Sequence, residues 1–189
     1  MTAMVTMPPA TTERCRQLLQ RWRQDLRLTR REQGLLRGEL TLLDRQLQRL
    51  EHKVLRLAVF GRVGVGKSSL INALVGQRLL ETDVAHGSTR RQQAVTWPLK
   101  LDGLQRVELI DTPGIDEIDA AGRTRLATRV AMGVDLVLLV IDSDLTRCDR
   151  DALETLQASG KPLRLVLNRS DRWPEEQLPE LLDSIRSRL

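Results

Sequence analysis

Hydrophobic residues recur along the first third of the chain in alternating steps of four and three residues. The clearest run consists of Leu36, Leu40, Leu43, Leu47, Leu50, Val54 and Leu57. In the same register, the run extends back through Gln33, Thr29, Leu26, Trp22 and Leu19. This spacing predicts one apolar stripe on a long helix, with Arg and Glu on its other faces. We expect a break or bend at Gly34 and Gly38, because each weakens a helix by about 1 kcal/mol relative to Ala.

After Lys53 the pattern changes to short apolar runs that alternate with longer amphipathic segments. Val54–Phe60 predicts a buried strand that is followed directly by glycines. Further strands are expected over 93–100, 106–110, 135–141 and 162–167, and helices over 67–76, 119–132, 147–159 and 176–188. Such alternation is typical of crossover units, so the predicted fold class is α/β with a mostly parallel sheet. Asp102-Gly103 predicts a hairpin turn between the second and third strands.

Positive charge is concentrated in the N-terminal part of the chain. Residues 11–56 hold 12 Lys and Arg against 6 Asp and Glu, a balance of 12 − 6 = +6, and the remainder carries 18 − 19 = −1. We therefore expect a disordered lead over 1–10, a basic amphipathic helical segment over 11–53 and an α/β domain over 54–189. A basic segment suits a protein partner, an anionic membrane surface or RNA, and it is otherwise a solvated helix face.

The apolar stripe of this segment has two interpretations. It packs on a neighbouring domain or partner, or it forms a coiled coil that dimerises. Thr29 and Gln33 lie in the seam and disfavour a long coiled coil, so packing or partner binding is the favoured interpretation; the oligomeric state stays open. With one Phe, three Trp and no Tyr in the chain, any RNA contact would be mainly to phosphates.

The cysteines of the chain predict a reducing compartment, and its hydropathy pattern is typical neither of a secretory signal nor of a membrane-spanning helix. Cys15 and Cys148 stand alone, which disfavours a disulfide framework or a zinc site. The first ten residues lack the pattern of a secretory signal. The longest strongly apolar stretch, Val134–Ile141, is much shorter than the roughly 20 residues of a membrane-spanning helix. We expect a cytoplasmic protein, with the basic segment as the part that would make it peripheral to a membrane.

Residues 61–68 read Gly-Arg-Val-Gly-Val-Gly-Lys-Ser and fit the pattern G-x-x-x-x-G-K-[ST] between a predicted strand and a predicted helix. Glycines allow the backbone to wrap a phosphate with its N–H groups, and the helix N-terminus adds partial positive charge. Lys67 is expected to act catalytically on the β- and γ-phosphates, and Ser68 to bind Mg²⁺. The nucleotide-binding residues expected in this segment are Gly61, Gly64, Val65, Gly66, Lys67, Ser68 and Ser69.

A second motif, Asp111-Thr-Pro-Gly114, follows a predicted strand, 111 − 67 = 44 residues after Lys67. An Asp at the carboxyl end of such a strand can hold Mg²⁺ through water, and the Gly N–H can reach the γ-phosphate. Between the two motifs, Thr89 in Gly87-Ser-Thr-Arg90 is expected to complete the Mg²⁺ shell, in a loop that orders when the γ-phosphate is present. Thr89 and Gly114 are therefore expected to take part in catalysis together with Lys67.

A third motif, Asn168-Arg169-Ser170-Asp171, follows the last predicted strand. Asp171 is expected to accept hydrogen bonds from the ring N–H and the exocyclic amine of guanine; adenine lacks this donor pair and would leave a carboxylate unpaired. Asn168 is expected to bond the base and tie its loop to the phosphate loop. Arg169 is expected to lie flat on the base.

These motifs, in this order, resemble the translation-factor-related P-loop GTPases of the Era and TrmE type. The segment from Gly66 to Gly76 is also similar to dynamin-related GTPases, and residues 57–98 resemble bacterial GTPases that carry a C-terminal membrane-associated domain of unknown function. The resemblance implies a three-layer, Ras-like G domain over 54–189 that uses GTP or GDP with Mg²⁺. It implies that Ser68, Thr89 and Asp111 serve the metal and that Asn168, Arg169 and Asp171 serve the guanine base.

The chain departs from the family pattern at three positions. Arg169 replaces the usual Lys of the guanine motif. Ile115 follows the Asp-x-x-Gly motif where many GTPases place a Gln that orients water, so hydrolysis needs another group, a partner or a cation. Gly64 stands where the Era and TrmE type often has an Asn for a monovalent cation, which leaves a potassium mechanism unsupported. Such domains also end with a further strand and helix; the chain stops at Leu189, and we expect five strands with that strand and helix missing.

Three functions are compatible with these motifs. The favoured one is a slow GTP-hydrolysing switch in which Mg²⁺ and Lys67 neutralise charge on the phosphates. The second is a non-hydrolysing GTP- or GDP-binding interaction module, which Ile115 keeps open. The third is an ATP-using P-loop protein, against which Asn168 and Asp171 argue.

Overall fold

The computed structural model describes residues 9–81, 93–117 and 119–189, and the chain divides into two compact units. The first, here called the N-terminal unit, comprises Met1–Leu55 and Lys100–Arg106. The second, here called the α/β unit, comprises Arg56–Leu99 and Val107–Leu189. Strand β1 (Val54–Phe60) passes from one unit to the other.

The N-terminal unit contains three helices, α1 (Pro9–Asp25), α2 (Arg30–Leu35) and α3 (Arg37–Glu51), so the long helix that was expected with a break or bend at Gly34 and Gly38 is interrupted twice. Helix α1 ends before Thr29, which caps α2: its hydroxyl accepts from the N–H of Glu32, and the Glu32 carboxylate accepts from the N–H of Thr29 at 2.8 Å. The second break falls at Leu36, between the two glycines where a break was expected. Helix α1 begins at Pro9, within the stretch predicted as disordered, because Pro is tolerated at the first helical position.

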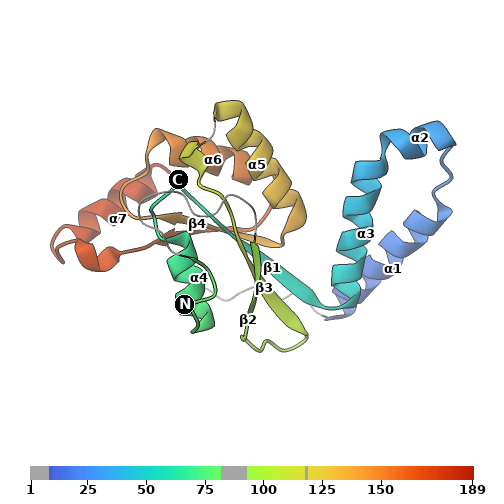
Figure 1. The fold of residues 1–189 in the computed structure, drawn as a ribbon, viewed down its shortest axis with the longest axis horizontal. Coiled ribbons are helices and arrows are strands. Elements are labelled where there is room, and N and C mark those ends of the chain that lie inside the picture. Colours follow the sequence, from blue (N-terminus) through green and yellow to red (C-terminus); the bar gives the residue numbers. More distant parts are fainter. Residues whose placement is uncertain (1–8, 82–92, 118) are drawn as a thin grey trace. The chain divides into compact units, whose positions relative to one another are not determined.

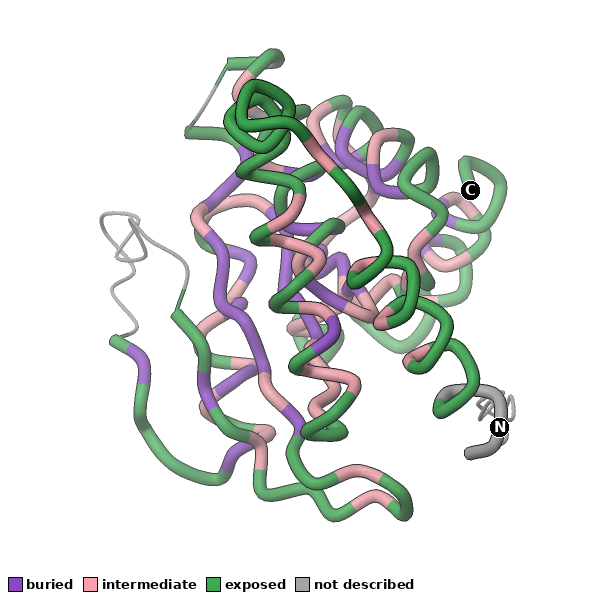
Figure 2. The backbone as a smooth tube through the Cα atoms, turned by 90° about the vertical axis from the view of Figure 1, so that its right-hand side faces the viewer, coloured by how far each residue is buried: buried purple, intermediate pink, exposed green. Residues whose placement is uncertain are grey.

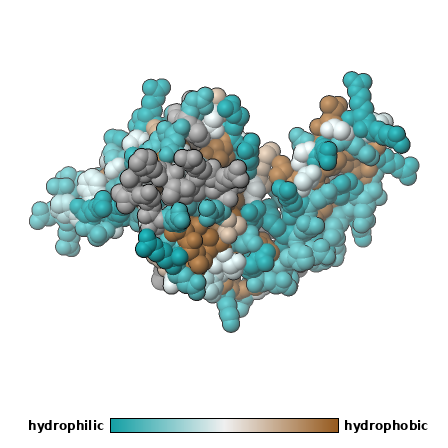
Figure 3. Space-filling model, viewed as in Figure 1, coloured by the Kyte–Doolittle hydropathy of each residue, from teal (hydrophilic) through white to brown (hydrophobic). Residues whose placement is uncertain are grey.

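Helices α1 and α3 lie side by side, and their ion pair joins Arg23 to Asp44 at 2.8 Å. On α1 the more covered side chains are polar, whereas the apolar ones are exposed. Leu18 retains 56% and Trp22 retains 53% of their accessible surface, and hydrophobic residues accordingly reach the surface of this unit (Figure 3). Of the described helices, none is both long and apolar enough to cross a bilayer.

The α/β unit is built on a five-stranded sheet of order β2-β3-β1-β4-β5 (Figure 1). Strands β1, β4 and β5 are parallel, with Phe60 opposite Leu139 and Leu139 opposite Leu165, and β2 is antiparallel to β3. The tube in Figure 2 is buried along the central strands, as expected for parallel strands covered on both faces. The remaining strands are β2 (Gln93–Trp97), β3 (Arg106–Asp111), β4 (Leu136–Ile141) and β5 (Leu163–Leu167).

The predicted strands and helices of this unit are confirmed, with ends displaced by a few residues. Strand β2 stops at Trp97 rather than at residue 100, because Pro98 has no N–H for the sheet. The hairpin turn, whose residues belong to the N-terminal unit, is also present, with the N–H of Leu104 donating to the carbonyl of Leu101 at 3.1 Å and Gly103 at φ +82°. The helices are α4 (Lys67–Val75), α5 (Ala120–Gly133), α6 (Arg147–Ala158) and α7 (Leu178–Ser187), with 3-10 turns η1 (Ile115–Glu117) and η2 (Ser170–Arg172).

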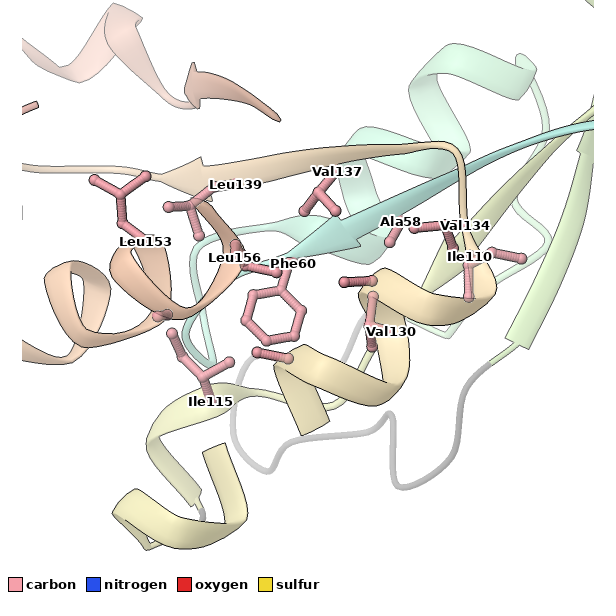
Figure 4. Packing of buried hydrophobic residues seen from close by; sticks show 13 residues of the cluster. Ala58, Phe60, Ile110, Ile115, Val130, Val134, Val137, Leu139, Leu153 and Leu156 are labelled. Carbon is pink, nitrogen blue, oxygen red and sulfur yellow. The ribbon is translucent and has the colours of Figure 1, made fainter. Parts of the chain in front are cut away.

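Helices α5, α6 and α7 cover one face of the sheet, and α4 lies on the other (Figure 1). The main core joins side chains of β1 and β4 to α5 and α6, with Phe60 at its centre (Figure 4). Aromatic residues are scarce, so this core is built mostly of Leu, Val, Ile and Ala. A smaller cluster places Leu181 and Ile185 of α7 on Ile141.

Replacing a core side chain of α6 tests this packing. We expect Leu156→Ala to lower the free energy of unfolding by about 2–5 kcal/mol, because Leu156 is fully buried in the main core. The exposed neighbour Gln157→Ala should change it by less than about 0.5 kcal/mol. Urea unfolding followed by circular dichroism measures both, and equal effects would contradict the packing described.

Candidate functional site

The predicted site residues lie at the carboxyl ends of the strands, around the end of β1. The chain proceeds from β1 to β2 and β3 on one side and to β4 and β5 on the other, so strand order reverses at β1. In open α/β sheets, ligands bind in the crevice at such a point. The loop 61–66 begins directly after β1, Asp111 ends β3, and Asn168 follows β5.

The glycines of the loop 61–66 are required by close contacts as well as by backbone angles. Gly61 has φ +151°, and a Cβ there would meet the carbonyl oxygen of Val140. Gly66 has φ +89°, and a Cβ there would lie 2.5 Å from Nδ2 of Asn168. The loop is therefore held against the ends of two other strands, which positions its N–H groups for an anion.

Lys67 begins helix α4 and is buried, with 7% of its surface exposed. Its Nζ donates to the carbonyl of Arg62 at 2.7 Å, across the loop. Burial lowers the pKa of Lys67, and the carboxylates of Asp111, Asp116 and Glu117 oppose that shift. The side chain thus presents a partly compensated positive charge beside the loop, which suits the binding of phosphate.

Ser68 and Asp111 meet next to this lysine. The Ser68 hydroxyl donates to Oδ2 of Asp111 at 2.7 Å, and Asp111 is fully buried at the end of β3. Thr112, the next residue, is also buried and donates to the carbonyl of Val59 at 2.8 Å, which fixes the strand end. A hydroxyl and a carboxylate oxygen are hard ligands of the kind that Mg²⁺ prefers. Thr89, the third predicted metal residue, lies outside the described residues.

The segment after Asp111 lies against the loop 61–66, here called the phosphate loop. A Cβ on Gly114 would collide with the side chain of Val63 and lie 2.9 Å from its backbone nitrogen, so only Gly fits. Ile115 is completely buried in the main core (Figure 4). It therefore faces away from the crevice where a water-orienting Gln would act. Asp116 points the other way, and its Oδ1 accepts from the N–H of Val63 at 2.7 Å.

The loop 168–171, which is predicted to recognise the base and is here called the base-recognition loop, is tied to the phosphate loop as expected. Nδ2 of Asn168 donates to the carbonyl of Val65 at 2.8 Å, and the backbone N–H of Asn168 donates to the carbonyl of Ile141 at 2.7 Å. Arg169 adopts a left-handed conformation, with φ +55°. Asp171 follows in η2 with an exposed carboxylate, and Ser69 is exposed on the first turn of α4. The predicted nucleotide roles of Asp171 and Ser69 stay predictions.

Asp142 belongs to this site and was missed by sequence reasoning. Its Oδ2 accepts from Nη1 of Arg169 at 3.1 Å, and its Oδ1 accepts from Nη2 of Arg62 at 3.2 Å. Asp142 thereby links the base-recognition loop to the phosphate loop. The available signal was its position directly after the strand β4, because Asp111 was identified by its position directly after a predicted strand.

Asp149 is a second residue that was missed. It is fully buried in the first turn of α6, and both of its oxygens accept from Nε of Arg62, at 3.2 and 3.1 Å. The same carboxylate accepts from the N–H of Thr146 at 3.0 Å and completes a capping box. Arg62 therefore anchors the phosphate loop to α6. The spacing Thr146-x-x-Asp149 could have identified the cap but not the ion pair.

Comparisons with known proteins agree with this arrangement. The family model described as 50S ribosome-binding GTPase matches residues 56–169, which contain the first two motifs and the first two residues of the third. GTPase Der of Rhizobium johnstonii is 42% identical over 121 residues, or 61% of this chain and 25% of that protein. Two Era structures, one from Aquifex aeolicus bound to GDP.AlF4- and one with MgGDPNP and nucleotides 1506–1542 of 16S ribosomal RNA, match with TM-scores of 0.61 and 0.60 at 26% identity.

These relatives are longer than this chain. The chain spans about a quarter of the length of Der. The two Era matches cover 71% of this chain and 47% of those chains. The family match lies within the α/β unit, and the Ras-like fold expected from the sequence is confirmed by the Era structures.

Removing the Asp142 carboxylate tests the link between the two loops. We expect Asp142→Ala to weaken the binding of fluorescent GDP by about tenfold, because Arg62 and Arg169 lose a shared acceptor within hydrogen-bond distance. Asp151→Ala, on the exposed face of α6, should leave the affinity unchanged. A GDP affinity for Asp142→Ala equal to that of the parent would show that the link is dispensable.

Proposed function

The chain belongs to the family of 50S ribosome-binding GTPases, and on this basis we propose that it binds GTP with Mg²⁺ and hydrolyses it to GDP and phosphate as a slow molecular switch. The expected resemblance to Era-type GTPases is confirmed by the matches to Der and Era. The observation that carries the proposal is the hydrogen bond from Asn168 to the carbonyl of Val65. It joins the base-recognition loop to the phosphate loop in one site.

The phosphates are proposed to be bound by the loop 61–66 with Lys67, by the pair Ser68 and Asp111 through the metal, and by residues on the γ-phosphate side. Lys67 and the N–H groups of the loop 61–66 bind and orient the phosphates. Ser68 and Asp111 are hydrogen-bonded to each other, and they would hold Mg²⁺ together with phosphate oxygens and water. The metal would neutralise charge on the β- and γ-phosphates. The N–H of Gly114 is proposed to donate to the γ-phosphate, and the hydroxyl of Thr89 is proposed to complete the Mg²⁺ shell.

The base end of the site selects guanine in this proposal. Asp171 would accept from the ring N–H and the exocyclic amine of the base, which adenine does not offer together. Arg169 would cover the base, held by Asp142. Arg in place of Lys is suited to this role, because its guanidinium is planar and can bond the carboxylate while it stacks.

Hydrolysis is expected to be slow without a partner. Ile115 is buried in the core, and its side chain cannot hydrogen-bond an attacking water. Alignment of the nucleotide and neutralisation of its charge remain available from Lys67 and the metal pair. The rate without a partner should therefore lie well below the 1–100 per second typical of kinases, roughly at the level of intrinsic GTPases.

Two measurements test the proposed function. In Mg²⁺ buffer, unlabelled GTP should displace fluorescent GDP from the protein, and ATP should not. Phosphate release from GTP should exceed background and fall to background in Lys67→Ala, because the charge that binds the phosphates is lost. Equal competition by ATP would overturn the assignment of Asn168 and Asp171. Release that persists in Lys67→Ala would indicate a contaminating enzyme, and tight binding without release would indicate a binding module.

The N-terminal unit is proposed to recruit a partner, either a protein or the surface of a membrane. Leu18, Leu19 and Trp22 form an exposed apolar face on α1, and the exposed residues Arg14 and Arg21 border it. An apolar face bordered by arginines fits an interface that is partly hydrophobic and negatively charged. RNA is the alternative partner, supported by the Era structure with a ribosomal RNA segment. In either case the site of action would be cytoplasmic.

Paired variants separate these partners. Leu18→Ser with Trp22→Ser removes the apolar face, and Arg14→Glu with Arg21→Glu reverses its border. For a membrane partner, we expect both pairs to reduce co-sedimentation with vesicles containing anionic phosphatidylglycerol by at least about fivefold. Loss of binding to a ribosomal RNA probe in the arginine pair alone, with a steep salt dependence, would instead identify RNA. Nucleotide binding by the α/β unit should be unchanged in both pairs.

A further inference from the structure

We propose that Asp116 is an internal competitor of the γ-phosphate: its carboxylate holds the phosphate loop in the GDP-bound and nucleotide-free states and must leave when GTP binds. The inference rests on the proposed function, because it concerns how the same site distinguishes GTP from GDP. It assigns a role in nucleotide discrimination to a residue outside the three sequence motifs.

The first support is the position of the Asp116 carboxylate. Its Oδ1 accepts from the backbone N–H of Val63 at 2.7 Å, so an anion of the protein itself is bound to the anion-binding loop. The residues that place it there are tightly constrained. Gly114 touches Val63 with no room for a side chain, and the N–H of Ile115 donates to the carbonyl of Gly61 at 3.3 Å.

The second support is the charge around Lys67. The carboxylates of Asp111, Asp116 and Glu117 all act on this one ammonium group and favour its charged form. Asp111 is committed to Ser68 and the expected metal. Asp116 and Glu117 are exposed and belong to η1, the turn that follows the γ-phosphate-sensing Gly114. A γ-phosphate that approaches Lys67 would therefore meet the negative charge of Asp116 at the same loop.

GTP differs from GDP only by its γ-phosphate, and the charge of this group is what would meet Asp116. The α- and β-phosphates lie deeper in the loop, towards the N-terminus of α4, and do not need the place of Asp116. The γ-phosphate adds negative charge on the side of Gly114 and Val63, so GTP has to displace the carboxylate and GDP does not. Release of Asp116 removes its hydrogen bond between η1 and the loop and leaves the longer one from Ile115 to Gly61. The exchange of one anion for another thus converts the presence of a γ-phosphate into movement of η1.

The test compares affinities for GDP and for the non-hydrolysable analogue GMPPNP in the full chain with Mg²⁺. Asp116→Asn keeps an oxygen that can accept from the N–H of Val63 but removes the charge. We expect it to raise the affinity for GMPPNP relative to GDP by about fivefold to tenfold, with GDP binding little changed. The gain should shrink at about 0.5 M salt, because Asp116 is exposed and its charge is screened. Asp116→Ala should shift the ratio in the same direction.

Glu154→Gln is the matched control, since it makes the same change in charge on the exposed face of α6, away from the carboxylates that act on Lys67. It should change the GMPPNP to GDP ratio by less than about twofold. If Asp116→Asn and Asp116→Ala bind GDP like the parent and leave the ratio unchanged, the role of Asp116 is overturned while the proposed function stands. If the parent protein itself does not bind GDP, the proposed function fails and this inference fails with it.

Discussion

The buried ammonium group of Lys67 is the feature on which the arrangement of the site depends. Moving such a cation out of water costs several kcal/mol unless hydrogen bonds and opposite charges compensate it. Here the carbonyl of Arg62 accepts a hydrogen bond from it, and carboxylates from the end of β3 and from η1 supply opposite charge. The loop, the strand end and the turn after Gly114 are therefore arranged around one charge. A change in that charge balance, such as the arrival of a phosphate, acts on all three together.

A second chain of charges connects parts of the site that lie far apart in the sequence. Arg62 in the phosphate loop is bound by Asp149 of α6 and by Asp142, and Asp142 also binds Arg169 beside the expected position of the base. Arg62 is thus bound by two carboxylates. Arg169, which shares Asp142 with Arg62, replaces a residue that is usually Lys. A guanidinium can bind a carboxylate and still present a flat face, which an ammonium cannot do. The departure from the family pattern at Arg169 is consistent with the presence of Asp142 at this position.

The sequence was sufficient to predict the α/β unit and the positions of its motif loops. Strand β1 was predicted to the residue, and three functional loops were correctly placed at strand ends, because local periodicity and glycine spacing determine these features. The hairpin of α1 and α3 was missed because the apolar period continues through Thr29, although the cap Thr29-x-x-Glu32 was readable. Asp116, Asp142 and Asp149 were missed for a different reason: their partners in the phosphate loop, Arg62 and Val63, lie 53 to 87 residues away, and no local pattern reports such contacts.

The burial of Ile115 has a thermodynamic consequence. If η1 moves when GTP displaces Asp116, Ile115 at its first position is drawn out of the core, where it packs among residues of β1, α5 and α6. Exposing a side chain of this size costs about 1.5–3 kcal/mol near room temperature and raises the heat capacity of the protein. The burial of Ile115 would then stabilise the state in which η1 lies on the core, and the size of this stabilisation would depend on temperature. The balance between the two nucleotide states of this protein would shift with temperature more than in a GTPase with a polar, exposed residue at that position.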